Sequence, residues 1–326
     1  MSKIELKPPI IIKKLDVLLK RSSPTHYKRP QIIESHRRFK AGYSGEQSLK
    51  YFYRYLPNDN VLYLPALRIM DDEYYFQMDQ LIVTSNFLLI LEIKNLAGYL
   101  YFDDKVKQLI RTLDGKKECF EDPIEQVRRQ SYHLEKILKQ LKFPIIPIER
   151  LVIITNPATI VEFSPTYKEA FAKVIKSAQL HHKFTEFQQK YQTPMLTSKE
   201  MKKLSKQLFK LHDAHDPDVC DLFEMDKREL LKGVLCPKCD QPFIMYYKGA
   251  NWWCPNCPHK SKTAHIEALK DYALIISTTI TNREFKYFLH LPSTSITTHL
   301  LKALNLPYTG STKSRSYNLL PLLNLK

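Results

Sequence analysis

Two acidic residues and a lysine in the first third of the chain have the types and the spacing of a metal-binding catalytic centre. Asp79 lies inside a strand-like segment, and 13 residues later the sequence Glu92-Ile93-Lys94 ends the next apolar segment. In a hairpin of this length the two acids can lie opposite each other. Glu92 and Lys94 point to the same side because strand side chains alternate. Two carboxylates on one surface form a hard-oxygen site that suits Mg²⁺ or Mn²⁺.

Hydrolysis of a phosphodiester bond is the chemistry that such a site can supply. A bound divalent ion lowers the pKa of a water ligand and neutralises charge on the pentavalent transition state. A lysine beside it can orient the attacking hydroxide or stabilise that charge. A Glu–Lys pair that only solvates the end of a strand, with Asp79 as a turn-facing acid, explains the same residues one by one. However, a charged Glu-x-Lys after an apolar strand is costly for the fold alone, which favours the metal site.

Four of the six cysteines form two Cys-x-x-Cys pairs that are separated by 14 residues. Two such turns can present four thiolates to one tetrahedral Zn²⁺, and this is the spacing of a zinc ribbon. A redox pair would not come in two matched copies that each contain proline. A closed Cys₄ site is structural, since it leaves no open position for catalysis. The predicted ligands are Cys236, Cys239, Cys254 and Cys257.

The segment between the two cysteine pairs predicts a β-hairpin, formed by residues 243–247 and 251–253. Its aromatic side chains could stack on nucleic-acid bases, or they could form the core of so small a module. They are Tyr246, Tyr247, Trp252 and Trp253. His259 and His265 follow nearby, but we expect neither to bind the metal because four thiolates already complete its shell.

The net charge of +16 is concentrated at the two ends of the chain. Residues 1–40 hold 11 basic and 3 acidic residues, and residues 258–326 hold 9 and 3. The stretch 41–257 is nearly neutral, with 30 basic and 28 acidic residues. Basic ends around an acid-bearing centre fit a polyanion that is gripped by its phosphates, although a general contribution to solubility fits as well.

Hydrophobic periodicity predicts an α/β domain over residues 41–211. Ser44 is the expected N-cap of a first helix, which ends before Pro57. A long amphipathic helix is expected over 123–141. Strands are expected over 61–69, 74–84, 87–93, 98–102, 108–113 and 151–155, and further helices near 178–191 and 197–211.

Residues 42–141 resemble a NERD domain, the nuclease-related domain of the PD-(D/E)xK, restriction-endonuclease-like superfamily. Four motifs carry the resemblance in the family's order, and together they are far more specific than any one of them. They are Gly42-Tyr43-Ser44-Gly45-Glu46, Gln77-Met78-Asp79-Gln80, Leu91-Glu92-Ile93-Lys94-Asn95 with Gly98 soon after, and Asp122-Pro123-Ile124-Glu125-Gln126.

The resemblance implies a restriction-endonuclease-like mixed sheet flanked by helices. It also implies that Asp79 and Glu92 are metal ligands and that Lys94 is the catalytic lysine. Glu46 would be a further acid that reaches the site from the first helix. Gln126 would face the cleft from the long helix.

Some of these residues suit a purely structural role as well. Where the family pattern has asparagine at the start of the long helix, this chain has Asp122, which also suits a helix N-cap. Glu46, in the first turn of its expected helix, is favoured there by the helix dipole in any case. Gln126, Gln130 and His133 share one helix face. We expect Gln130 and His133 to belong to a solvated polar stripe.

Five segments are expected along the chain. They are a basic N-terminal extension (1–40), a NERD nuclease-like domain (41–211), a linker (212–232), a zinc ribbon (233–265) and a helical C-terminal segment (266–326). The last segment predicts short helices over 285–291 and 296–304, followed by a tail of basic, hydroxyl and aromatic residues. This pattern resembles a DNA-binding winged helix-turn-helix, and a plain helical cap on the ribbon fits it too.

These observations favour a nuclease that hydrolyses DNA phosphodiester bonds with Mg²⁺ or Mn²⁺ and that carries a structural Zn²⁺. The alternatives are a catalytically inactive nucleic-acid binding or sensing protein, and a zinc-ribbon transcription or assembly factor on an α/β scaffold. The last leaves Glu92 and Lys94 unexplained. No run of about 18 apolar residues predicts a transmembrane helix, and no signal-peptide pattern begins the chain. We therefore expect a cytoplasmic protein with no membrane partner.

Overall fold

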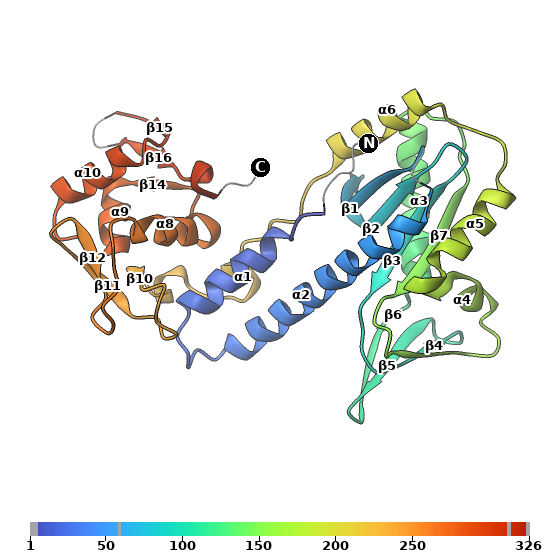
Figure 1. Cartoon of the computed structure of the whole chain (residues 1–326), viewed down its shortest axis with the longest axis horizontal. Helices are drawn as coiled ribbons and strands as arrows, with labels where there is room; N and C mark the ends of the chain where they lie inside the picture. The colour runs from blue at the N-terminus through green and yellow to red at the C-terminus, as the bar shows by residue number, and fades with distance from the viewer. Residues whose placement is uncertain (1–5, 58–59, 312–313, 324–326) are drawn as a thin grey trace. The chain divides into compact units, whose positions relative to one another are not determined.

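The computed structural model describes residues 6–57, 60–311 and 314–323 of a mixed α/β protein. The chain divides into two compact units (Figure 1). Residues 40–215 belong to the first unit, and residues 9–39 and 216–326 belong to the second. None of the helices in the described ranges is long and apolar enough to cross a membrane.

A five-stranded mixed sheet forms the centre of the first unit. Its strand order is β1-β2-β3-β7-β9; β1 to β3 are antiparallel neighbours, and β7 and β9 continue the sheet in parallel with β3. The strands are β1 (Leu62–Asp71), β2 (Tyr74–Val83), β3 (Leu88–Lys94), β7 (Ile148–Ile154) and β9 (Val174–Lys176). Every residue of β3 before Lys94 is buried, which explains why this strand is almost continuously apolar.

Helices cover both faces of this sheet, and two separate hydrophobic cores result. α3 (Pro123–Gln140) and α6 (Ser198–Leu211) contribute to the core on one face. The C-terminal part of α2 (Arg29–Phe52) and α5 (Leu180–Lys190) contribute to the core on the other. A second, four-stranded sheet has the order β6-β5-β4-β8. Its strands are β4 (Tyr99–Asp103), β5 (Gln108–Leu113), β6 (Lys116–Glu121) and β8 (Ile160–Phe163).

The sequence predicted the order of the elements in this unit better than it predicted the start of the first helix. The bounds of β5 agree with the expected strand, and those of α3 differ by one residue. The expectation that Ser44 caps a helix was wrong, because α2 begins at Arg29 and continues through Ser44 without interruption. Gly42 and Gly45, on either side of Ser44, also lie within this helix.

The expected N-terminal extension and linker contribute to the core of the second unit. The amphipathic helix α1 (Ile10–Arg21) packs with α7 (Val219–Leu222) and the end of α8 (Ala264–Ile275) in one apolar cluster. Arg21 is fully buried and donates to the Asp271 carboxylate at 2.9 Å and to the Leu231 carbonyl at 2.8 Å. The N-terminal helix therefore belongs to the same compact unit as the C-terminal part of the chain.

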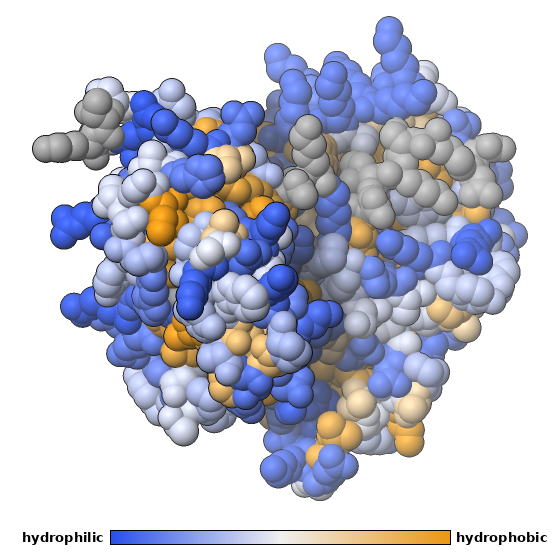
Figure 2. Space-filling view, turned by 60° about the vertical axis from the view of Figure 1, so that its left-hand side comes forward, coloured by the Kyte–Doolittle hydropathy of each residue, from blue (hydrophilic) through white to orange (hydrophobic). Residues whose placement is uncertain are grey.

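The cysteine-bearing hairpin and the C-terminal helices share one core in the second unit. Trp252 and Met245 from the hairpin pack with Leu269, Phe285 and Leu301 from the helices. The hairpin belongs to a four-stranded sheet of β10 (Val234–Leu235), β11 (Ile244–Lys248), β12 (Asn251–Trp253) and β13 (Lys260–Ser261). The helices after α8 are α9 (Asn282–Leu289) and α10 (Thr294–Ala303), with the strands β14 (Thr279–Thr281), β15 (Tyr308–Thr309) and β16 (Ser316–Asn318). Figure 2, in which this unit comes forward, shows separate hydrophobic patches among hydrophilic side chains.

Candidate active site and metal centre

Asp79 lies where the pairing of β2 with β3 ends. The last paired residues are Gln80 and Leu91, and beyond them the two strands no longer exchange backbone hydrogen bonds. At the next position the Asp79 side chain replaces the backbone as hydrogen-bond acceptor. Its Oδ2 accepts a hydrogen bond from the Ile93 backbone N–H at 2.8 Å. The end of the strand pair therefore brings Asp79 beside the Glu92-Ile93-Lys94 motif.

Glu92 is the centre of the polar cluster. It is only 2% exposed, and each of its carboxylate oxygens accepts a hydrogen bond. Lys94 Nζ donates to Glu92 Oε1 at 2.7 Å, and Gln130 Nε2 donates to Glu92 Oε2 at 2.8 Å. Lys94 Nζ also donates to Gln126 Oε1 at 3.1 Å. Gln126 and Gln130 lie four residues apart on α3, so one helix face supplies both amides.

The expectation that Gln130 belongs to a solvated stripe was wrong. The side chain is 3% exposed, and its Nε2 also donates to the Gln77 carbonyl at 2.8 Å. Its Oε1 is buried and has no hydrogen-bond partner within the described ranges. The four-residue spacing between Gln126 and Gln130 indicated that both lie on one face of the helix. The contact between Gln130 and Glu92 could not be predicted in this way, because it depends on how the helix packs on the sheet. His133, one turn later, instead pairs with Asp71 at 2.6 Å and lies outside the cluster.

Three acids influence one another in this site. Burial and the Glu92 carboxylate raise the pKa of Glu46 to about 7. Burial and the charges of Glu92 and Glu46 raise the pKa of Asp79 well above its usual range. Burial opposes the charge on Lys94, but the attraction of Glu92 and Asp79 outweighs it and raises the pKa of the Lys94 ammonium. With all three acids ionised, the site would have more negative charge than its single lysine balances.

Glu46 reaches this region from the interior of α2, not from the first turn of a helix as we expected. The helix begins 17 positions earlier, so the dipole of its N-terminus does not account for an acid here. Gly45 explains how the helix comes close enough. A Cβ at Gly45 would lie 2.7 Å from Asn95 Cβ and 3.1 Å from Thr155 Oγ1. Asn95 Nδ2 also donates to the Ala41 carbonyl at 2.9 Å and so fixes the helix against the end of β3.

This close approach predicts opposite effects for two alanine substitutions in one helix. Gly42→Ala is expected to raise the free energy of unfolding by about 0.5–1 kcal/mol, because alanine favours helix and a Cβ at Gly42 meets nothing within 4 Å. Gly45→Ala is expected to lower it by about 1–3 kcal/mol through overpacking. Urea unfolding of both variants measures the difference. An increase in stability with both would show that α2 does not need to approach Asn95 so closely.

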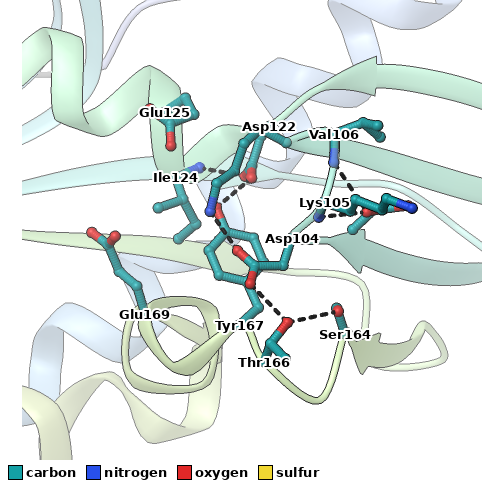
Figure 3. Close-up of polar contacts among 12 residues, drawn as sticks. Asp104, Lys105, Val106, Asp122, Ile124, Glu125, Ser164, Thr166, Tyr167 and Glu169 are labelled. Carbon is teal, nitrogen blue, oxygen red and sulfur yellow. Dashed lines mark hydrogen bonds and ion pairs between the residues drawn. The ribbon is translucent and has the colours of Figure 1, made fainter.

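The start of α3, which positions both glutamines, is held by a second polar network (Figure 3). Asp122 is the N-cap, as its type predicted, and its Oδ1 accepts from the Ile124 N–H at 2.9 Å. Its Oδ2 accepts from the hydroxyl of the buried Tyr167 at 2.5 Å. Next to Tyr167, Thr166 donates to Asp104 at 2.8 Å. These bonds connect the start of α3 to the second sheet. They therefore restrain the rotation of α3 about its axis and the direction in which Gln126 points.

The four cysteines of the two Cys-x-x-Cys pairs converge in the second unit. Within the described ranges they are the only group of three or more Cys, His, Asp or Glu side chains whose ligand atoms all lie within 4.8 Å of one another. The Sγ atoms of Cys236 and Cys257, and those of Cys239 and Cys254, are 3.7 Å apart. A tetrahedral Zn²⁺ with bonds of about 2.3 Å requires sulfur atoms about 3.8 Å apart. The donors and their spacing are therefore consistent with a zinc ribbon.

Of the other residues predicted around the ribbon, Trp252 and His265 are buried and Tyr246 is exposed. Trp252 is fully buried and donates from Nε1 to His265 Nδ1 at 3.2 Å. His265 is therefore an acceptor, and burial lowers its pKa to about 4. Neither His259 nor His265 belongs to the cysteine cluster. Tyr246 is 52% exposed, whereas Tyr247 packs against the shared core.

Comparison with known families identifies part of the first unit. The family model described as NERD, nuclease-related domain, matches residues 41–155. The match begins in α2 and ends just after β7, and so includes Glu46, Asp79, Glu92, Lys94 and Gln126. The chain therefore carries a NERD nuclease-related domain, about a third of its length, followed by a four-cysteine cluster. No curated protein and no solved structure matches the chain.

Proposed function

We propose that the NERD domain is the catalytic part of a DNA nuclease that uses Mg²⁺ or Mn²⁺ and has the PD-(D/E)xK arrangement. The observation that supports this most strongly is the contact between Lys94 and the buried Glu92, with Asp79 held beside them by the Ile93 N–H. These are the residue types that metal-assisted phosphodiester hydrolysis requires.

The charge of the site fits a divalent cation. If Glu46, Asp79 and Glu92 are all ionised, Lys94 balances one of three negative charges, and a divalent ion would balance the other two. The pKa values of Glu46 and Asp79 are raised by burial and because negative charge in the site is not fully balanced. Without a metal, these two acids therefore tend to keep their protons. The oxygens of the three acids do not all lie within 4.8 Å of one another. We therefore propose Asp79 and Glu92 as the ligands, with Glu46 as a further acid that tunes the charge.

Hydrolysis forms a bond from a water oxygen to phosphorus, breaks a phosphorus–oxygen ester bond, and transfers a proton to the leaving oxygen. When bound, the metal would lower the pKa of the attacking water and neutralise charge on the phosphate. Lys94 is held by Glu92 and Gln126 with its ammonium in the site, where it can donate to a non-bridging phosphate oxygen or orient the water.

DNA is the proposed substrate because of the charge at the two ends of the chain. The excess of basic residues over acidic ones is eight in residues 1–40 (11 minus 3) and six in residues 258–326 (9 minus 3). An excess of basic residues favours a polyanionic partner such as nucleic acid. A nucleic-acid binding protein without catalysis would use the same basic ends, so cleavage itself is the discriminating measurement.

The proposal is tested by incubating the full-length protein with supercoiled plasmid, linear duplex and single-stranded DNA, with and without Mg²⁺ or Mn²⁺. Lys94→Ala is expected to lower the cleavage rate by about 10²–10³-fold, since it removes a cation beside the reacting phosphate. Lys116→Ala, at an exposed position on β6, is the matched control and should cleave like the wild type. Absence of metal-dependent cleavage by the wild type on all three substrates, or equal cleavage by Lys94→Ala, would rule out the catalytic assignment.

A further inference from the structure

The C-terminal part of the second unit contains a helix-turn-helix with an attached hairpin. Along the chain the elements are α8, β14, α9, α10, β15 and β16, and the three strands pair in the order β14-β16-β15 (Figure 1). α9 ends at Leu289 and α10 begins at Thr294, so four residues form the turn. His290 in this turn has φ 55°, the left-handed conformation that a tight connection between two helices requires. This element order is that of a winged helix-turn-helix, in which α10 occupies the recognition-helix position.

α10 has one face for the core and another for solvent. Leu300 and Leu301 are buried in the core that the helices share with the zinc ribbon. Asn282 at the start of α9 donates to Thr298 Oγ1 at 3.0 Å and links the two helices. The exposed side chains of α10 recur at a spacing of three and four residues, which places them on one face. They include Ser295, His299 and Lys302.

The sequence after Glu284, which includes α10 and the hairpin, contains no acidic residue. Glu284 is the last Asp or Glu of the chain, and five Lys or Arg residues follow it. Glu284 itself is used in the capping box of α9, where it accepts from Thr281 at 2.7 Å. In the hairpin, the Arg315 guanidinium lies 4.2 Å from the centre of the Tyr308 ring. Residues 312 and 313, which the sequence placed in the basic tail, lie outside the described residues.

We propose that α10 binds in the major groove of double-stranded DNA and that the hairpin of β15 and β16 contacts the neighbouring sugar-phosphate backbone. Ser295 and His299 have donors and acceptors for base edges, and Lys302 and Arg315 have the charge for phosphates. The major groove of B-DNA admits a helix, whereas that of an RNA duplex is too narrow and deep. This site is distinct from the Asp79–Glu92 cluster, and its binding does not require that the NERD domain cleave DNA.

The test measures binding of the full-length protein to a fluorescent mixed-sequence DNA duplex by anisotropy, without Mg²⁺ or Mn²⁺, over a range of salt concentrations. Ser295→Glu/Lys302→Glu is expected to weaken binding by at least about tenfold and to reduce its salt dependence, because it places negative charge on the proposed contact face. The matched control, Gln241→Glu/Lys248→Glu, changes the charge by the same amount at exposed positions near the hairpin of the ribbon and should bind within about twofold of the wild type. Zinc content and thermal midpoint, measured on both variants, should equal those of the wild type.

Two competitors complete the experiment. An RNA duplex and a DNA single strand of the same sequence should each compete at least about tenfold less well than the DNA duplex. Unchanged affinity of the α10 variant would overturn the proposal, as would equal weakening in both variants, which would indicate attraction by overall charge. Equal binding of single-stranded DNA or duplex RNA would exclude groove recognition. Loss of plasmid cleavage in an Asp79 or Lys94 variant leaves this result unaffected, so the two proposals fail separately.

Discussion

Replacing Asp79 with asparagine is expected to reduce metal-dependent DNA cleavage by at least about 10³-fold while leaving the protein at least as stable as the wild type. Asparagine keeps the shape of the side chain and can still accept the hydrogen bond from the Ile93 N–H. It also removes a buried carboxyl group whose ionised form burial and the charges of Glu92 and Glu46 disfavour. Function and stability should therefore move in opposite directions, as expected for a charge that serves a metal and not the fold.

The same carboxyl group predicts how the stability of the metal-free protein depends on pH. Burial and the neighbouring acids raise the pKa of Asp79 in the folded state, so the folded chain retains a proton that the unfolded chain releases. The free energy of unfolding should then fall as pH rises from the usual carboxylate pKa toward the raised value. Glu46, with a pKa of about 7, contributes with the same sign. Asp79→Asn should flatten this dependence, and Mg²⁺ should reverse it in the wild type because metal binding requires the ionised acids.

Thermal unfolding between pH 5 and pH 8, with and without Mg²⁺, measures this effect beside the cleavage assay. Asp114→Asn is the control, because Asp114 is exposed in the turn between β5 and β6 and asparagine suits its positive φ of 49°. It should cleave DNA like the wild type and keep the wild-type pH profile. Wild-type cleavage by Asp79→Asn, or a marked loss of its thermal stability, would show that Asp79 is a structural residue.

The charged residues of the site that lie on strands could be predicted to lie close together from the sequence. The residues that contact them from α3 could be predicted only in part. Asp79, Glu92 and Lys94 lie on adjacent strands, and the alternation of side chains places Glu92 and Lys94 together. Gln130 was assigned to solvent because the helix pattern alone gives no sign of what lies opposite it. Its partner, Glu92, is 38 residues away, and only the packing of α3 on the sheet brings the two into contact.

The packing of α2 and of the N-terminal residues was also hard to predict, because it depends on contacts between residues far apart in the sequence. Ser44 was expected to cap the first helix, but α2 begins at Arg29. Glycine in a helix usually weakens it. Within α2, however, Gly45 removes the Cβ that would collide with Asn95. The N-terminal residues appeared only basic, since Arg21 gives no local sign that it will be buried against Asp271, 250 positions later. Local patterns predicted the elements, and the long-range contacts decided which unit each element joined.

Removal of the metal from the cysteine cluster is expected to unfold the second unit. Structural zinc in such sites contributes on the order of 10 kcal/mol, which is comparable with the whole stability of a domain. The core beside the cluster contains Cys236 and Cys254 together with the fully buried Trp252, and it includes residues from α8, α9 and α10. Because these helices have no separate core, we expect them to lose their structure when the ribbon does.

Cys254→Ser tests this expectation with a local signal, because both tryptophans of the chain, at 252 and 253, belong to the ribbon. The variant should bind less than the wild-type amount of zinc, measured with a colorimetric chelator, and its tryptophan emission should shift to that of exposed indole. Cys119→Ser, in an exposed position on β6 outside the cluster, is the control and should retain both signals. Unfolding of α10 with the ribbon should also remove the duplex binding proposed for it. Native emission from Cys254→Ser without zinc would show that side-chain packing alone maintains this unit, and the cluster would then have a role other than folding.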